Sequence, residues 1–327
     1  MRYYGRRLGF YLLAAWAAIT INFLLPRFMP GNPVEVLLAR LKGHLSPQAT
    51  NALMLQFGLA HQSSLVHEYI SYLGQLSRGQ LGISITYFPT PVSTVVGEAL
   101  PWTIVLIGFA TVVSFLLGTA LGILIGWRRG SRLDLLLPAS TFFSAIPYFW
   151  LALLAVLVFG YVLNWFPTSG GYGLTNTIGF NLPFVESAIS HAVLPAFTII
   201  VASIAGWLLS MRNMMVTVLG EDYVALAEAK GLPSRRVVLT YGARNAILPN
   251  VANFALSLGF VVSGAILTEA VFSYPGIGYL LFEAVSNEDF PLAQAIFLVI
   301  TITVLLANLL ADVLYGLLDP RARQGGR

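Results

Sequence analysis

The chain has 327 residues, of which 57% are hydrophobic and only 10% are charged. A soluble domain carries about 25% charged residues, so this composition excludes an ordinary soluble protein and predicts an all-α membrane protein. The isoelectric point near 9.4 would suit a nucleic-acid binder. The basic residues, however, lie in short clusters between apolar runs, which is typical of membrane topology. We therefore expect contact with membrane lipid and none with nucleic acid.

The chain has no cysteine, and its four histidines show no paired metal-ligand spacing. Without thiols there is no disulfide, no thiolate metal site and no cysteine nucleophile. Because the sequence also lacks an H-E-x-x-H pattern, we expect no metal centre and no catalytic residue on this chain.

Six apolar runs are long enough to cross a bilayer as a helix, which takes about 20 residues. They cover residues 8–26, 101–127, 135–163, 188–211, 251–271 and 292–318. The first run follows Arg2, Arg6 and Arg7 as a signal peptide would, but it is long and leads into Phe28-Met29-Pro30 without a cleavage site of small residues. We interpret it as an uncleaved anchor.

These runs predict the domain organisation. Residues 1–28 form a cytoplasmic N-terminus and the first helix, and residues 29–100 form an extracytoplasmic segment with short helices. Residues 101–318 form a five-helix core with a cytoplasmic loop over residues 212–250, and residues 319–327 form a cytoplasmic tail. Residues 164–186 are rich in Gly, Pro, Asn and Thr and are expected to form an outer loop.

The distribution of Lys and Arg orients the six helices. With a cytoplasmic N-terminus, fourteen of the eighteen basic residues lie in inner segments, and two of the three outer loops have none. The four outer ones are Arg27, Arg40, Lys42 and Arg78. Cytoplasmic loops carry an excess of Lys and Arg, so we expect a multi-pass protein of the cytoplasmic membrane with both termini in the cytoplasm.

No ATP-binding loop is present. The two lysines, Lys42 and Lys230, each precede a glycine, and neither belongs to a G-x-x-x-x-G-K-[ST] pattern. If ATP drives transport, another chain must bind it.

An ion-coupled secondary transporter is the alternative from another class. Such proteins place ionisable residues in the middle of the membrane. Here Asp134, His191, Glu269 and Asp312 fall near the ends of the predicted spans, where side chains more often snorkel or cap helices than relay protons. The alternative stays open on sequence alone.

The cytoplasmic loop contains a predicted short helix. Asp222 is expected to cap its N-terminus, residues 225–229 favour helix, and Gly231 before Leu232-Pro233 is a C-terminal stop. A second, basic helical piece is expected over residues 234–247. Small residues at positions 225, 229 and 231 would let a partner approach closely. An amphipathic helix on anionic lipid, favoured by the arginines at 235, 236 and 244, explains the same pattern.

Several motifs resemble one family. Residues 222–249, with Ala-Glu-Ala-Lys-Gly-Leu and later Ala-Arg-Asn-Ala-Ile-Leu-Pro, resemble the EAA loop of ABC-importer permeases. The match is to the first-permease type of the dipeptide, oligopeptide and nickel group. Further landmarks occur in order along the chain: Arg6-Arg7-Leu8, Met29-Pro30-Gly31-Asn32-Pro33, Leu81-Gly82-Ile83-Ser84, Phe166-Pro167-Thr168-Ser169-Gly170-Gly171, residues 269–278 and Leu318-Asp319-Pro320-Arg321. Asn32 replaces the acid usual in this group.

The resemblance implies the type I importer fold of a bacterial or archaeal membrane, working by alternating access. It implies a second, similar permease subunit, two ATP-binding subunits that carry ATP and Mg, and an extracytoplasmic binding protein. No cofactor is implied on this chain. The loop helix would be the coupling helix that docks on an ATP-binding subunit. The docking residues implied are Asp222, Tyr223, Ala227, Glu228, Ala229, Lys230 and Gly231.

Other features keep two interpretations. Tyr274-Pro275-Gly276 is a candidate outer gate or a plain turn. The spacing of Gly118, Gly122 and Gly126 favours a helix-packing seam over a substrate contact. Peptides are the favoured substrate, with oligosaccharides or nickel complexes as alternatives, and the substrate-binding residues are unknown from sequence. The aromatic residues at 148–150 and 165 suit a pathway or an interfacial belt.

The charge distribution predicts the topology directly. Reporter fusions after Arg132, Gly231 and Arg323 should report the cytoplasm, and fusions near Gln62, Gly173 and Asn287 should report the outside. A cytoplasmic signal at Gly173 would contradict the six-span arrangement.

Overall fold

The structure, a computed structural model, describes residues 2–28, 64–263 and 265–318, with side chains left undescribed at residues 2–4, 6, 26, 27 and 310–318. Most of the predicted extracytoplasmic segment, the landmark at residues 29–33 and the predicted tail lie outside these ranges. So does the side chain of Asp312. The described residues are helical apart from loops and one isolated bridge between Ile83 and Pro91.

The chain divides into two units, one of residues 1–102 and 275–327 and the other of residues 103–274. Helix α5 (Val92–Trp127) runs from the first unit into the second. Among the described residues, four helices are long and apolar enough to span a membrane, and the number rises to six if each of two bent pairs is one span. The all-helical prediction is confirmed, and six spans fit once these pairs are counted.

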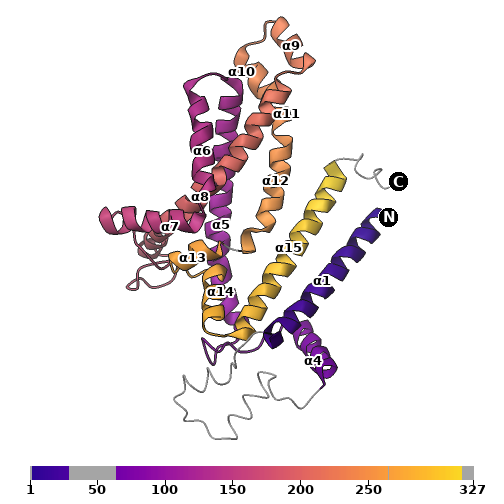
Figure 1. Ribbon diagram of the computed structural model, residues 1–327, viewed down its shortest axis with the longest axis vertical. Helices are drawn as coiled ribbons and strands as arrows, with labels where there is room; N and C mark the ends of the chain where they lie inside the picture. Colours follow the sequence, from indigo (N-terminus) through magenta and orange to yellow (C-terminus); the bar gives the residue numbers. More distant parts are fainter. Residues whose placement is uncertain (1, 29–63, 264, 319–327) are drawn as a thin grey trace. The chain divides into compact units, whose positions relative to one another are not determined.

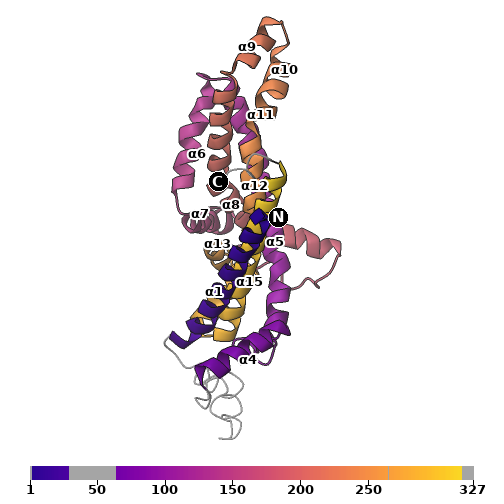
Figure 2. The same cartoon turned by 90° about the vertical axis from the view of Figure 1, so that its right-hand side faces the viewer.

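The first unit contains α1 (Arg2–Phe28), α4 (Leu65–Ser77), α14 (Ile277–Ser286) and α15 (Phe290–Leu318). Both views show α15 beside α1 (Figures 1 and 2). Two reciprocal hydrogen bonds join these helices. Asn22 Nδ2 donates to the backbone carbonyl of Gln294 at 2.8 Å, and Gln294 Nε2 donates to the backbone carbonyl of Asn22 at 3.1 Å. Between apolar helices in lipid, such side chains act as directional contacts.

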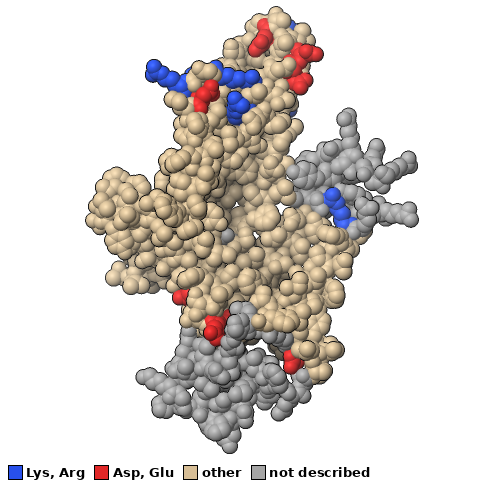
Figure 3. All heavy atoms as spheres, in the orientation of Figure 1, with Lys and Arg blue, Asp and Glu red and all other residues tan. Residues whose placement is uncertain are grey.

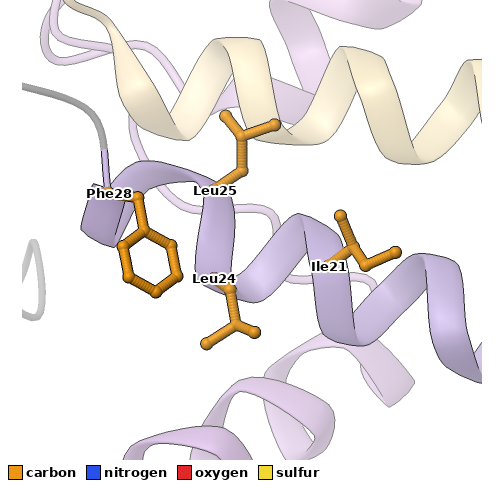
Figure 4. Close-up of a pocket in the computed structure, with 4 residues that line it drawn as sticks. All are labelled: Ile21, Leu24, Leu25 and Phe28. Atoms are coloured by element: carbon orange, nitrogen blue, oxygen red, sulfur yellow. The ribbon is translucent and has the colours of Figure 1, made fainter.

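One face of α1 is apolar and open. Its residues Ile21, Leu24, Leu25 and Phe28 line a shallow hollow (Figure 4). Because all four side chains are apolar, the hollow suits an acyl chain or another helix and offers nothing to a polar substrate.

A buried carboxylate organises the start of α15. Asp289 caps the helix, since its Oδ1 accepts from Leu292 N at 3.1 Å. Its Oδ2 accepts from Ser84 Oγ at 2.5 Å and from Thr86 N at 2.8 Å. Asp289 therefore fastens the loop before α5 to α15. Nearby, the Tyr87 hydroxyl donates to Glu283, and burial, followed by this hydrogen bond, raises the pKa of Tyr87.

The second unit begins with the rest of α5, followed by η1 (Arg132–Leu135), α6 (Leu136–Ala145), α7 (Tyr148–Ala155) and the π-helical η2 (Val156–Val162). Helix α8 (Leu182–Val218) then crosses the unit. The predicted cytoplasmic loop holds α9 (Asp222–Ala229), α10 (Ser234–Arg236), the π-helical η3 (Val237–Ala243) and α11 (Arg244–Ala246). The unit ends with α12 (Leu248–Gly259), η4 (Val261–Ser263) and α13 (Ile266–Val271).

The predicted third span is not one helix. Helices α6 and α7–η2 meet at an angle of 94°. The cause is local: Ile146, before Pro147, has ψ 128°, because a proline ring disfavours the helical conformation of the preceding residue. The other bent pair, α12 with η4–α13, turns by 41°. Each bent pair still counts as one span if its two parts cross the membrane together.

Two predicted boundaries also differ. Helix α5 begins at Val92 and includes Pro101, and α8 extends from Leu182 to Val218 with Pro195 inside. A proline explains the difference in α5, because sequence patterns treat an internal proline as a stop, whereas helices in membrane proteins tolerate it where neighbours satisfy the freed carbonyl. The predicted span over residues 188–211 already contained Pro195, and α8 is longer than this span at both ends, so that it continues into the segment predicted as the start of the cytoplasmic loop.

The glycine seam is confirmed. Three glycines one turn apart on α5 lie so close to α8 that none has room for a side chain. An added Cβ at Gly118 would lie 2.6 Å from Trp207 Cβ, one at Gly122 would lie 2.7 Å from Leu208 O, and one at Gly126 would lie 2.6 Å from Met215 Cβ. Only glycine allows this approach. The seam holds the part of α5 from Gly118 to Gly126 against α8 backbone to backbone.

We predict that Gly122→Ala destabilises the protein by about 1–3 kcal/mol, because the methyl group must displace α8. Gly108→Ala on the same helix is the matched control, since its Cβ would meet only Val261 Cγ1 at 4.0 Å. The control gains up to about 1 kcal/mol of helix propensity. Thermal unfolding of the purified variants in detergent checks this, and equal midpoints for the two variants would contradict the seam.

Candidate functional site

If Asp222 were the N-cap, helix α9 would begin at Tyr223. The helix begins one residue earlier. Glu221 occupies the N-cap position without a side-chain capping bond, and Asp222 is the first helical residue. The expectation that Asp222 caps the helix was therefore wrong. Its carboxylate lies in the first turn instead, where a negative charge still interacts favourably with the helix dipole.

The C-terminus of α9 closes in a Schellman motif. Gly231 has φ +73°, its N–H donates to the Glu228 carbonyl at 2.8 Å, and the Leu232 N–H donates to the Ala227 carbonyl at 3.3 Å. The predicted need for a left-handed residue at Gly231 is confirmed. An added Cβ at Gly231 would meet nothing within 4 Å, so the surface beside it is open.

The inner side of α9 packs on its own loop. Val224, Ala227 and Val237 form a buried cluster, against which Leu219, Leu232 and Tyr241 pack. Of the predicted docking residues, Ala227 is thus 3% exposed and supports the helix from inside. Its small side chain is needed by this packing whatever lies on the other side.

The opposite side, which we name the α9 outer face, is exposed. It consists of Asp222, Tyr223, Ala225, Leu226, Glu228, Ala229, Lys230 and Gly231. Leu226 is 56% exposed and was missed by the sequence analysis. The helical period could have predicted this exposure, because Leu226 does not share the side of the helix on which Val224 and Ala227 lie, three positions apart. In the space-filling view, charged side chains gather at the end of the second unit where α9 and α10 lie (Figure 3).

The loop is fixed to the membrane helices. Its buried residues Val238, Ala243 and Ala246 join Met211, Met215 and Val218 of α8 in one cluster. Gly242 permits this, since a Cβ there would lie 3.1 Å from Leu219 Cδ2 and 3.3 Å from Met215 Cε. The end of α8 also receives a hydrogen bond from Arg129 Nη2 to the Val216 carbonyl at 2.9 Å.

A side-chain hydrogen bond joins the outer face to the loop that follows it. Asn245 Nδ2 on α11 donates to the Tyr223 hydroxyl at 3.1 Å and to the Tyr241 carbonyl at 3.1 Å. Helix α9 is therefore braced at its first turn by Asn245 and underneath by the Val224 cluster. A force applied to α9 would be passed to α8 and α11 rather than absorbed by a flexible loop.

Comparison with known proteins identifies the family of the chain. Residues 118–324, which include the glycine seam and the α9 loop, match the family described as "Binding-protein-dependent transport system inner membrane component". The chain belongs to this family. It is the membrane permease of such a system and not its ATPase.

Individual relatives align along almost the whole permease. It is 33% identical to the di/tripeptide transport system permease protein DppB of Pseudomonas aeruginosa over 99% of both chains. It is 32% identical to the oligopeptide transport system permease protein AppB of Bacillus subtilis over 92% of both. It is also 32% identical to the dipeptide transport system permease protein DppB of Escherichia coli over 97% of both.

The candidate outer gate of the permease lies just after α13. That helix ends like α9: Ser273 has φ +45°, its N–H donates to the Ala270 carbonyl at 3.1 Å, and Tyr274 N–H donates to the Glu269 carbonyl at 2.9 Å. Tyr274 is 2% exposed, and burial, with a smaller effect of Glu269, raises its pKa. Gly276 is the N-cap of α14. A gating role stays a prediction.

The predicted outer loop is attached to this turn. Gly170 N–H donates to the Phe272 carbonyl at 2.8 Å, and Gly160 on η2 approaches Thr168 so closely that a Cβ would lie 2.6 Å from Thr168 Cγ2. Two landmarks that stand far apart in the sequence, residues 166–171 and 269–278, therefore meet in the second unit at this hydrogen bond.

Three of the ionisable residues near the span ends have hydrogen-bonding partners, distant in the sequence for Glu269 and local for Asp134 and His191. Glu269 is fully buried and accepts from Thr103 Oγ1 at 3.1 Å, so the expectation that it snorkels or caps was wrong. Asp134 Oδ2 accepts from Gly130 N at 2.7 Å, and His191 Nδ1 lies 2.7 Å from the Ser187 carbonyl. Within the described ranges there is no group of three or more residues that could hold a metal ion.

The Schellman motif predicts a local effect of substitution at Gly231. Gly231→Val forces a β-branched residue into a left-handed conformation at a cost of about 1–3 kcal/mol, whereas Gly231→Asn is tolerated there. Tryptic cleavage at Arg235 and Arg236 of the purified permease should rise about tenfold in the valine variant, following the open population of the loop. The asparagine variant should stay near wild type. Equal protection of both variants would contradict the motif.

Proposed function

We propose that this permease imports peptides by alternating access, driven by ATP that two partner subunits hydrolyse. Its other partners in this proposal are a second, similar permease and an extracytoplasmic binding protein. The observation that carries the proposal is the α9 outer face, an exposed helical surface braced onto α8 and α11. In this chain, which is a permease and not an ATPase, such a surface suits a docking site for the motor.

The chemistry of the outer face supports docking on a protein. Ala225, Ala229 and Gly231 leave the helix surface flat, so that another surface can approach its backbone. Leu226 stands exposed among them, and burying a leucine side chain contributes about 1.5–3 kcal/mol. Glu228 and Lys230 at its edge would set the orientation of the partner more than the affinity.

Peptides are proposed because of the relatives. Those named above transport dipeptides, tripeptides or oligopeptides according to their descriptions. Each alignment covers 92% or more of both chains, so whatever pathway residues the relatives use have counterparts here. Oligosaccharides and nickel complexes are the alternatives that the sequence left open, and the test below separates them.

The remaining parts of the proposal follow from topology. The excess of Lys and Arg in the predicted inner segments supports a cytoplasmic location for α9 and both termini, where ATP-binding subunits operate. Closure of these subunits on ATP would draw the coupling helices together and open the helix bundle outward. Tyr274-Pro275-Gly276 would then gate the outer side.

A lipid-surface role for the loop is the second candidate, because Arg235, Arg236 and Arg244 are exposed. The two interpretations assign the important residues differently. Docking places them on the α9 outer face, and lipid binding places them on the basic helix that follows.

The decisive experiment uses the complete complex reconstituted in lipid vesicles. We expect Leu226→Glu to weaken retention of the ATP-binding subunits at least about tenfold, since it removes an apolar contact and buries a charge. Gly231→Val should lower uptake in the same way, and Glu228→Ala should lower it less. Leu239→Glu is the matched control, because Leu239 is similarly exposed at 49% but lies on η3.

The same vesicles test the other parts of the proposal. The permease alone should hydrolyse no ATP, and a peptide-loaded binding protein should stimulate hydrolysis by the complex. Stimulation only by an oligosaccharide or a nickel complex would contradict the peptide assignment. Silent changes at Leu226 and Gly231, together with loss on replacing Arg235 and Arg236 by glutamine, would establish the lipid-surface alternative instead.

A further inference from the structure

One polar side chain is buried where the cytoplasmic loop becomes a membrane helix. Asn250 directly follows Leu248 and Pro249 at the start of α12, and it is 0% exposed. It is also the one fully buried residue among the twelve of α12. The rest of this helix is partly or fully exposed in the chain, so Asn250 is its deepest point of attachment.

The amide of Asn250 is bonded on both sides. Its Oδ1 accepts from Ser210 Oγ at 2.6 Å, and its Nδ2 donates to the Trp207 carbonyl at 3.2 Å and to Thr119 Oγ1 at 3.4 Å. Ser210 and Trp207 belong to α8, and Thr119 belongs to α5. One side chain thus joins three helices, in a setting where unsatisfied polar groups are costly and hydrogen bonds give direction.

The position of this junction is specific. Thr119 follows Gly118, where α5 and α8 are in backbone contact through Trp207. Asn250 therefore reaches both helices at the glycine seam. Next to it, the Phe254 ring of α12 stacks on Phe115 of α5 at 4.3 Å between centroids, and Phe115 meets Trp207 edge-on at 5.4 Å. The aromatic contacts add area, but the amide alone fixes the register.

The junction also lies at the end of the braced loop. Asn245, five positions earlier, holds the Tyr223 hydroxyl of α9, and the helical residues between them lead directly into α12. A displacement of α9 therefore arrives at the first turn of α12, where Asn250 is attached to the α5–α8 pair.

We infer that Asn250 is a positioning residue for energy coupling: it makes α12 move together with α5 and α8 when the docking helix is displaced. The inference rests on the proposed docking of α9. An apolar residue at this place would still fill the space, but its contacts have no preferred register. Helix α12 would then slip along the α5–α8 pair, and hydrolysis of ATP would be separated from transport.

The absence of cysteine from the sequence allows a direct measurement. Spin labels at Leu258→Cys on α12 and Leu124→Cys on α5, both exposed positions, report the separation of the two helices in the assembled complex. With Asn250 intact, the distance distribution should be the same in the nucleotide-free and ATP-bound states. With Asn250→Leu, it should broaden or shift on ATP binding. Asn253→Leu, an exposed asparagine on the same helix, is the matched control and should behave as wild type.

Dipeptide uptake per ATP hydrolysed is the second readout. We expect at least a fivefold fall in Asn250→Leu, with retention of the ATP-binding subunits and their ATP hydrolysis unchanged within twofold. Ser210→Ala, which removes one partner, should give a smaller fall and keeps the test available if Asn250→Leu does not assemble. An unchanged distance distribution, an equal effect of Asn253→Leu, or a loss confined to the amount of assembled complex would overturn the inference.

Failure of the proposed function would look different. If α9 does not dock the motor, Leu226→Glu leaves retention of the ATP-binding subunits intact. If peptides are not the substrate, uptake is absent in every variant while the label distances still report the junction.

Discussion

The backbone contact between α5 and α8 is the constraint on which the second unit depends. Three glycines spaced one turn apart remove every side chain from one stripe of α5, so that α8 lies against its backbone. In lipid there is little hydrophobic drive for two apolar helices to associate, and close packing over such a stripe supplies the attraction instead. The C-terminal end of α8, which contributes Met211, Met215 and Val218 to the loop cluster, is thereby placed.

The α9 loop packs against this placed end of α8 and has further contacts of its own. It is packed from below by residues of α8, fixed at its first turn by Asn245, and closed at its end by the left-handed Gly231. The far end of the unit uses the same device, because α13 closes on the left-handed Ser273. A serine there lacks the conformational freedom of glycine, at a cost of roughly 1–2 kcal/mol, and the hydrogen bond from Gly170 to Phe272 helps to hold the turn.

Buried polar side chains do the remaining positioning within each unit. Asn22 with Gln294 and Asp289 with Ser84 act in the first unit, and Asn250 and Glu269 act in the second. Each of these side chains forms a hydrogen bond to a helix or loop that is distant in the sequence. This is the expected use of polar groups in a low-dielectric interior, where they give direction rather than much net stability. It also explains Glu269 without a role in proton transfer, since Thr103 donates to it.

Four features followed from the sequence alone: the membrane environment, the approximate spans, the missing ATP-binding loop and the C-terminal end of α9. They depend on composition and on local rules, because an apolar run, a left-handed glycine and a following proline act within a few residues of themselves. Three others required the folded chain: the bend of the third span after Ile146, the inward side of Ala227 opposite the exposed Leu226, and the burial of Glu269. The tertiary structure alone showed that Asn250 joins three helices. Each of these outcomes depends on which distant surface arrives against the residue, and a pattern read along one chain does not contain that information.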